Sequence, residues 1–182
     1  MQTLFLLLAV ILGFAVIVIS WRPDKFSVAR SGFVGAPPEA VFPHIADLHK
    51  WDAWSPWAKL DPNATNEFDG PEQGPGASMR WAGNRNVGVG KMTITEAVPG
   101  ERIRIRLQFE KPFEADNQVD FVLKSENGGT NVSWSMSGKN GFIGKAMDMF
   151  YGCDRMIGGQ YEKGLANLKA VVEAETARTL PE

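Results

Sequence analysis

The chain opens with an uninterrupted apolar run. No charged residue occurs from Gln2 to Trp21. About 20 residues, rising about 1.5 Å each along a helix, are enough to cross a hydrocarbon core of about 30 Å. A cleaved signal peptide would have a basic start, an apolar stretch of about 7 to 15 residues and a small-x-small cleavage motif, and this run has none of them. We therefore predict a transmembrane anchor over residues 1–22.

After residue 78 apolar and polar positions alternate, which is the pattern of half-buried strands. Turn signals at 98–101, 111–112 and 127–128 divide this region and predict four consecutive antiparallel strands. Counting outward from the turns gives three cross-strand pairs on one apolar face: Ile94 with Ile105, Ile105 with Asn117, and Phe121 with Trp134. The same counting places Glu96 on that apolar face and puts Arg102 and Arg106 opposite aspartates on the other.

The segments on either side of this region have other patterns. Residues 26–34 predict a first strand, and apolar positions at helical spacing after Pro38 predict a short amphipathic helix. A short strand is expected around Glu67 and Phe68. From Phe142 to Val172 apolar residues recur every three to four positions, which predicts a long C-terminal helix. Because glycine weakens a helix, we expect a kink, a break or a close helix–sheet contact near Gly158–Gly159, and a polar tail over 176–182.

Three of the six tryptophans, Trp51, Trp54 and Trp57, lie within seven positions between the short helix and the strands. Indole rings bury large areas and keep one N–H that needs a partner, so such a cluster forms either a pocket wall or a structural corner. We favour the corner, with Trp54 as the member that contacts a ligand.

The stretch APPEAVFPHIAD at 36–47, followed by WDAWSPW at 51–57, resembles the N-terminal signature of the START-like superfamily, and in particular the polyketide cyclase/dehydrase and lipid-transport family. The likeness continues through residues 90–94, Pro99 and the strands at 102–109 and 130–138, and covers about 26–174. It implies an α+β helix-grip fold over residues 23–175, in which a curved antiparallel sheet wraps around a long C-terminal helix. It also implies a cavity for hydrophobic small molecules, while only some members catalyse cyclisation or dehydration.

Composition and charge limit the partners. A formal net charge of -2 over 182 residues gives no electrostatic reason to expect nucleic acid. The positive charges that follow the apolar run, Arg22, Lys25 and Arg30, favour a cytoplasmic domain on a single-pass protein of the inner (cell) membrane by the positive-inside rule. On the N-terminal side of the apolar run the only positive charge is the free amino group.

The residue types that carry chemistry are sparse. Cys153 is alone, which excludes an intrachain disulfide and a cysteine zinc cluster, and we interpret it as a packing residue. The two histidines, His44 and His49, are five positions apart and do not share a helix face, so we expect no metal site. The glycine-rich stretch 83–90 precedes a strand and lacks the ending of a phosphate loop. We expect no cofactor.

The leading hypothesis is therefore a membrane-anchored binding domain for a hydrophobic small molecule or lipid. The predicted ligand-binding residues are Trp54, Ile105, Leu107, Phe109, Asn117, Phe121, Trp134 and Met136. One alternative is a cyclase or dehydrase that uses Asn117 and Glu96, although two polar groups are a thin catalytic set. Another is a non-catalytic interaction module of a membrane complex, with its cavity filled by its own aromatic side chains.

Overall fold

The computed structural model describes residues 1–179, without the side chains of Leu8, Ile143, Met147, Asp148, Phe150, Tyr151, Cys153 and Thr179. The packing role predicted for Cys153 and the last residues of the predicted tail, 180–182, lie outside the described residues. The elements in chain order are α1 (Gln2–Ser20), β1 (Lys25–Val34), α2 (Pro38–Ala46), a 3₁₀ helix η1 (Leu48–Lys50), α3 (Trp51–Trp54), β2 (Thr65–Asp69), β3 (Ser78–Ala82), β4 (Val89–Val98), β5 (Arg102–Lys111), β6 (Ala115–Glu126), β7 (Gly129–Lys139), α4 (Phe142–Tyr151) and α5 (Cys153–Thr179).

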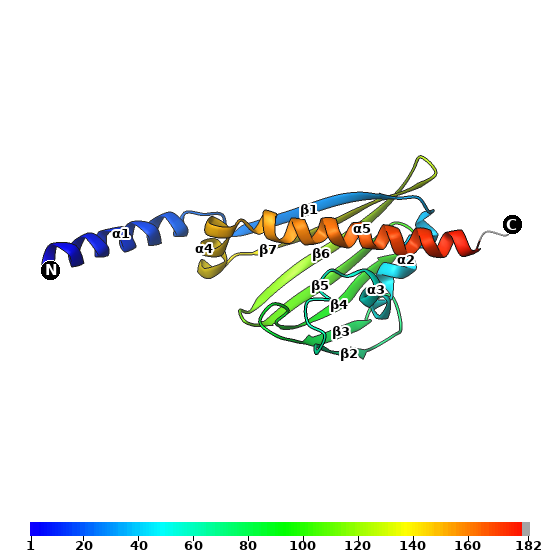
Figure 1. The fold of residues 1–182 in the computed structure, drawn as a ribbon, viewed down its shortest axis with the longest axis horizontal. Helices are drawn as coiled ribbons and strands as arrows, with labels where there is room; N and C mark the ends of the chain where they lie inside the picture. The colour runs from blue at the N-terminus through cyan, green and yellow to red at the C-terminus, as the bar shows by residue number, and fades with distance from the viewer. Residues whose placement is uncertain (180–182) are drawn as a thin grey trace.

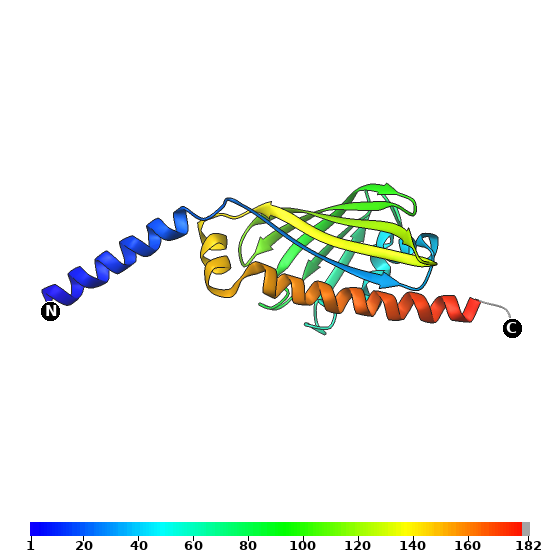
Figure 2. The same ribbon diagram turned by 90° about the horizontal axis from the view of Figure 1, so that it is seen from above.

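One antiparallel sheet and one long helix make up the domain. The seven strands follow the order β1-β7-β6-β5-β4-β3-β2. The long helix α5 runs along the sheet, and α2 and α3 lie near its C-terminal half (Figures 1 and 2). The apolar helix α1 projects from the opposite end, beside α4. This is the α+β helix-grip architecture that the sequence predicted.

The β4–β5 register agrees with the prediction over its central part and departs from it near the turn. Ile94 pairs with Ile105 as expected, but Val98 pairs with Arg102 because the strands shift register between Ile94 and Glu96. A one-residue bulge reverses the face of the residues beyond it. Glu96 therefore lies on the charged outer face, where its carboxylate forms ion pairs with Arg102 and Arg104. The prediction that Glu96 stands on the apolar face was wrong.

The β5–β6 register is displaced by two residues from the prediction. Ile105 pairs with Val119 rather than with Asn117, and Asn117 pairs with Leu107. The connection between the strands, residues 112–114, is longer than the tight turn assumed. Because side chains alternate with a period of two, this shift leaves every residue on its predicted face. The β6–β7 register was correct: Phe121 pairs with Trp134 around the turn at 127–128.

The C-terminal helical region is broken at Gly152, not at Gly158–Gly159. Gly152 has a φ of +69°, a left-handed conformation that favours glycine, and it separates α4 from α5. Gly158 instead makes the close helix–sheet contact, because a Cβ there would meet the Arg30 guanidinium. Arg30 of β1 donates hydrogen bonds to Asp154 at 2.9 Å and Glu162 at 2.8 Å, which fixes α5 on β1. The helix extends to Thr179, so the predicted tail begins as helix.

Two glycines of α5 provide a matched test of how tightly the helix packs. A Cβ at Gly164 would lie 2.6 Å from Cζ3 of Trp134, whereas one at Gly159 would meet nothing within 4 Å. We expect Gly164→Ala to lower the free energy of unfolding by about 1–3 kcal/mol through overpacking. Gly159→Ala should raise it by about 0.5–1 kcal/mol through the higher helix propensity of alanine. Thermal unfolding of the full chain in detergent, followed by near-UV circular dichroism, measures both. Equal stabilisation by the two substitutions would contradict the packing described here.

Candidate functional site

A cavity of about 1360 Å³ lies between the inner face of the sheet and the helices. The strands contribute mainly apolar side chains to it, including Met79, Met92, Leu107, Val119 and Met136. On the helical side it is closed by Trp51 of α3, by Trp57 after that helix and by Ile157 and Tyr161 of α5. These side chains come from elements far apart in the sequence, so the cavity forms only when α5 packs against the sheet.

Six of the eight predicted ligand-binding residues line this cavity: Ile105, Leu107, Phe109, Asn117, Trp134 and Met136. The other two, Trp54 and Phe121, are fully buried in the core behind its wall. The Trp54 indole donates a hydrogen bond to the His44 carbonyl at 2.9 Å and meets Phe121 edge-on. Of the three clustered tryptophans, Trp51 and Trp57 face the cavity instead, because Trp54 turns towards α2.

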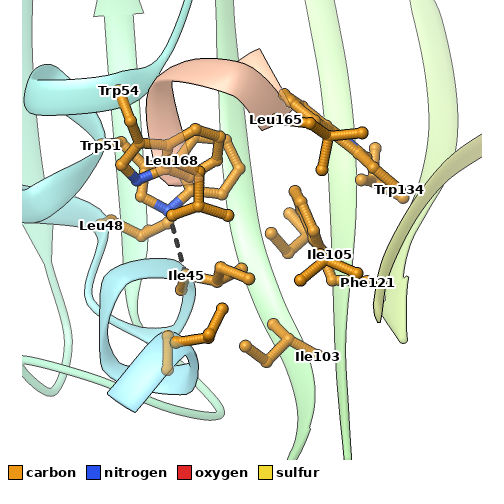
Figure 3. Close-up of a cluster of buried hydrophobic side chains, with 14 of the residues drawn as sticks. Ile45, Leu48, Trp51, Trp54, Ile103, Ile105, Phe121, Trp134, Leu165 and Leu168 are labelled. Atoms are coloured by element: carbon orange, nitrogen blue, oxygen red, sulfur yellow. Dashed lines mark hydrogen bonds between the residues drawn. The ribbon is translucent and has the colours of Figure 1, made fainter. Parts of the chain in front are cut away.

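An aromatic cluster forms one wall. Trp134 of β7 stacks on Tyr161 of α5 with their ring centroids 4.0 Å apart, and Trp57 meets both rings edge-on. Figure 3 shows Trp51 and Trp54 side by side, facing Leu168 of α5, with the Trp51 N–H bonded to Ile45. Phe121 and Trp134 meet these two indoles edge-on. The tryptophan cluster is thus both the structural corner that the sequence favoured and, through Trp51 and Trp57, part of the cavity wall.

Two polar atoms of the cavity residues are buried without a hydrogen-bond partner among the residues that the structure describes. They are Oδ1 of Asn117, an acceptor, and Nε1 of Trp134, a donor. Asn117 is only 6% exposed and pairs with Gly138, where a Cβ would lie 2.0 Å from Oδ1. Burial raises the pKa of the Tyr161 phenol, the stacking partner of Trp134. A bound molecule can satisfy such orphan groups.

Two further polar residues at the cavity, Asp61 and His49, are engaged in local structure. Asp61 accepts hydrogen bonds from the backbone N–H groups of Asn63 and Asn84 and so holds two loops together. His49 contacts Asp47 at 3.1 Å and stacks on Phe68. His44 lies outside the cavity, 3.3 Å from Glu175, and burial lowers its pKa. Within the described part of the chain, no three His, Cys, Asp or Glu side chains gather as a metal site. Of the two residues proposed for catalysis, only Asn117 reaches the cavity.

The cavity reaches the surface beside three exposed aromatic side chains. Phe68 of β2, Phe113 of the β5–β6 connection and Phe142 of α4 line it and are 41%, 50% and 48% exposed. Our sequence analysis did not assign these residues to the site. Phe113 lies in a connection between strands and Phe142 begins α4, so the alternation of the strands assigned neither ring to the cavity.

Comparisons with known proteins agree with this fold. A family model described as polyketide cyclase/dehydrase and lipid transport matches residues 25–173. Protein CV1439 from Chromobacterium violaceum is similar in structure, with a TM-score of 0.58, 20% identity and coverage of 84% of this chain and 99% of that one. Ara h 8.0201 has a TM-score of 0.60 and 12% identity, and the match covers 82% of this chain and 99% of that one. DynU16, from the dynemicin biosynthetic locus, has a TM-score of 0.56 and 16% identity. The match covers 84% of this chain and 48% of that one. At these identities the likeness establishes the fold alone. No curated protein matched.

Proposed function

Because the chain belongs to the polyketide cyclase/dehydrase and lipid-transport family, we propose that it is a membrane-anchored binding domain for a lipid or another hydrophobic small molecule. The ligand is held between the sheet and α5. The observation that carries this proposal is the cavity itself, whose volume of about 1360 Å³ exceeds the roughly 300–1,000 Å³ of ordinary ligand pockets. A space of this size suits an acyl chain, an isoprenoid or a multi-ring aromatic molecule.

The anchoring part of the proposal rests on α1. Its 19 residues have a mean hydropathy of 2.9 in their most apolar stretch and only 6% of that stretch is buried in the protein. An apolar helix that buries so little of its length in the protein needs an apolar surrounding, which a bilayer supplies. The basic residues after α1 favour a cytoplasmic domain at the inner (cell) membrane. Protease accessibility of the domain in sealed, oriented vesicles tests this, and digestion from the outside of right-side-out vesicles would reverse the orientation.

The size of the cavity argues against a domain filled by its own aromatic side chains. Trp51, Trp54, Trp57 and Trp134 pack against one another and leave the space over Leu107, Val119 and Met136 open. An enzymatic function has less support, because Glu96 faces outward and Asn117 alone does not form an acid–base pair. Binding is therefore the function that the geometry supports best.

Asn117 gives a prediction about ligand chemistry. Replacing it with the similarly sized leucine removes a buried acceptor that has no partner among the described residues. We expect Asn117→Leu to raise the free energy of unfolding of ligand-free protein by about 1–3 kcal/mol. The substitution should also weaken the binding of a fatty alcohol relative to that of an alkane of equal length. Thermal unfolding and competition with a fluorescent fatty acid measure the two effects. The control is Gln118→Leu, on the outer face of the same strand. Equal changes in stability and in ligand affinity in the two variants would contradict a role for Asn117.

The proposed function is tested by identifying lipids that co-purify with the full chain in polymer-bounded nanodiscs, using mass spectrometry. Lipids that merely surround α1 are also extracted, so the comparison is made with Leu107→Trp, which fills the cavity and leaves α1 unchanged. A species enriched in the wild type and depleted in the variant supports the proposal. Identical extracts, together with no gain of fluorescent fatty acid by the wild type, would overturn it.

A further inference from the structure

Part of the cavity lining, residues 112–115 and 139–142, lies at the end of the domain from which α1 emerges (Figure 1). Phe113 and Phe142, which are about half exposed, lie in the β5–β6 connection and at the start of α4. In Figure 1 both segments lie at the α1 end of the domain, while the β6–β7 turn lies at the other end. Apolar rings at a cavity mouth are costly to leave in water and mark a binding surface.

Short connections hold this mouth close to the membrane anchor. Only residues 21–24 separate α1 from β1, a span of at most about 14 Å for an extended chain. Lys145 of α4 donates a hydrogen bond to the Ser20 carbonyl at 3.2 Å and forms an ion pair with Asp24. The N–H of Asn140 bonds the Asp24 carbonyl at 2.8 Å. A bilayer that contains α1 therefore begins next to α4 and the mouth.

The charges around the mouth have the sign that favours an anionic bilayer. Lys25 and Lys139 are register partners on β1 and β7, both exposed, and Lys111 ends β5 beside the mouth. Four acidic residues lie nearby. Asp24, Glu110 and Asp116 are paired with Lys145, Arg80 and Arg106, which leaves Glu114 against the three lysines. The whole chain carries a net charge of -2, so the basic character of this end is local. Each lysine near an anionic membrane surface contributes about 1 kcal/mol of attraction.

We propose that this end of the domain docks on the anionic leaflet that α1 enters, so that the apolar ligand passes between leaflet and cavity without crossing water. The docking rim consists of Phe113, Phe142, Lys25, Lys111 and Lys139. The proposal rests on the anchoring by α1 proposed above. The rim faces the bilayer because the tether is short, and its two phenylalanines reach the interface while its lysines meet lipid phosphates.

The test places a fluorophore on single cysteines of the full chain in a Cys153→Ser background. Glu114→Cys labels the rim and leaves both phenylalanines in place, and Ser125→Cys labels the exposed far end near the β6–β7 turn. The protein is reconstituted into phosphatidylcholine vesicles with 30% phosphatidylglycerol and a nitroxide-headgroup lipid. We expect quenching at 114 to be at least threefold stronger than at 125. It should fall at least twofold when Lys25, Lys111 and Lys139 are changed to Gln, or in vesicles without phosphatidylglycerol.

The outcomes separate this proposal from the ligand-binding one. Quenching at 114 that persists in Leu107→Trp arises from the bilayer, whereas quenching lost in that variant arises from lipid in the cavity and overturns docking. If the protein floats with the vesicles but quenching at 114 and 125 is equal, docking is overturned while anchoring stands. The rim would then be a binding surface for a protein partner or a second copy. Protein that does not float with the vesicles overturns anchoring and docking together. None of these results depends on finding the natural ligand.

Discussion

Replacing Trp54 with alanine is expected to lower the free energy of unfolding by about 3–5 kcal/mol, the usual cost of removing a buried tryptophan. Trp54 has no exposed surface and contacts Trp51, Phe121 and Trp134. Its N–H satisfies the His44 carbonyl, and its own carbonyl accepts a hydrogen bond from Asn167 of α5 at 3.1 Å. Since domains are stable by only about 5–15 kcal/mol, this single change removes a large share of the total. Thermal or urea unfolding of the detergent-solubilised chain measures it.

Two further variants keep the Trp54 prediction testable if the alanine variant does not fold. Trp54→Phe retains a ring and loses the N–H, so it should cost about 1–3 kcal/mol by leaving the buried His44 carbonyl without its donor. Trp57→Ala, in the half-buried neighbour that lines the cavity, should cost only about 1 kcal/mol. Its main effect should be weaker ligand binding. If Trp57→Ala destabilised the protein as much as Trp54→Ala, the division between corner and cavity wall would be wrong.

Filling the cavity should have the largest effect on binding. Leu107 is half-buried in the middle of the cavity floor on β5, and a tryptophan at this position would occupy space that the ligand needs. We expect Leu107→Trp to lower the affinity for a fluorescent fatty acid at least tenfold, equivalent to about 1.4 kcal/mol of binding free energy. Stability should be unchanged or slightly higher, because the added ring gains contacts in a void. A fluorescence titration in detergent gives the affinity.

The matched control for cavity filling is Gln108→Trp, which adds the same ring one residue along the strand. Gln108 pairs with Lys91 and Asp116 and faces away from the cavity. The affinity of the Gln108→Trp variant for the fatty acid should stay within twofold of that of the wild type. A similar loss of affinity in both variants would place the ligand elsewhere than between the sheet and α5.

The faces of the strands could be predicted from the sequence, but their exact pairing could not. A shift of two residues between β5 and β6 leaves Ile105, Leu107 and Asn117 on the same face, so no alternation pattern can detect it. The bulge after Ile94 has the opposite consequence, because one extra residue moved Glu96 from the predicted cavity to the outer face. Asn117 kept its predicted face although its predicted pairing was wrong, because the shift of two residues is even.

The sequence by itself determined what depends on neighbouring residues: the apolar helix α1, the alternating faces of β4–β7, the 127–128 turn and the order of elements that resembles the helix-grip fold. Only the tertiary structure decided which aromatic rings face the cavity, because Trp51, Trp54 and Trp57 are equivalent by composition and differ only in their partners on α2, α5 and β7. It also decided that the cavity exists and that residues 139–142 of its lining lie near α1. An empty volume is set by how far α5 stands from the sheet, and that distance is a sum of long-range contacts that no local pattern encodes.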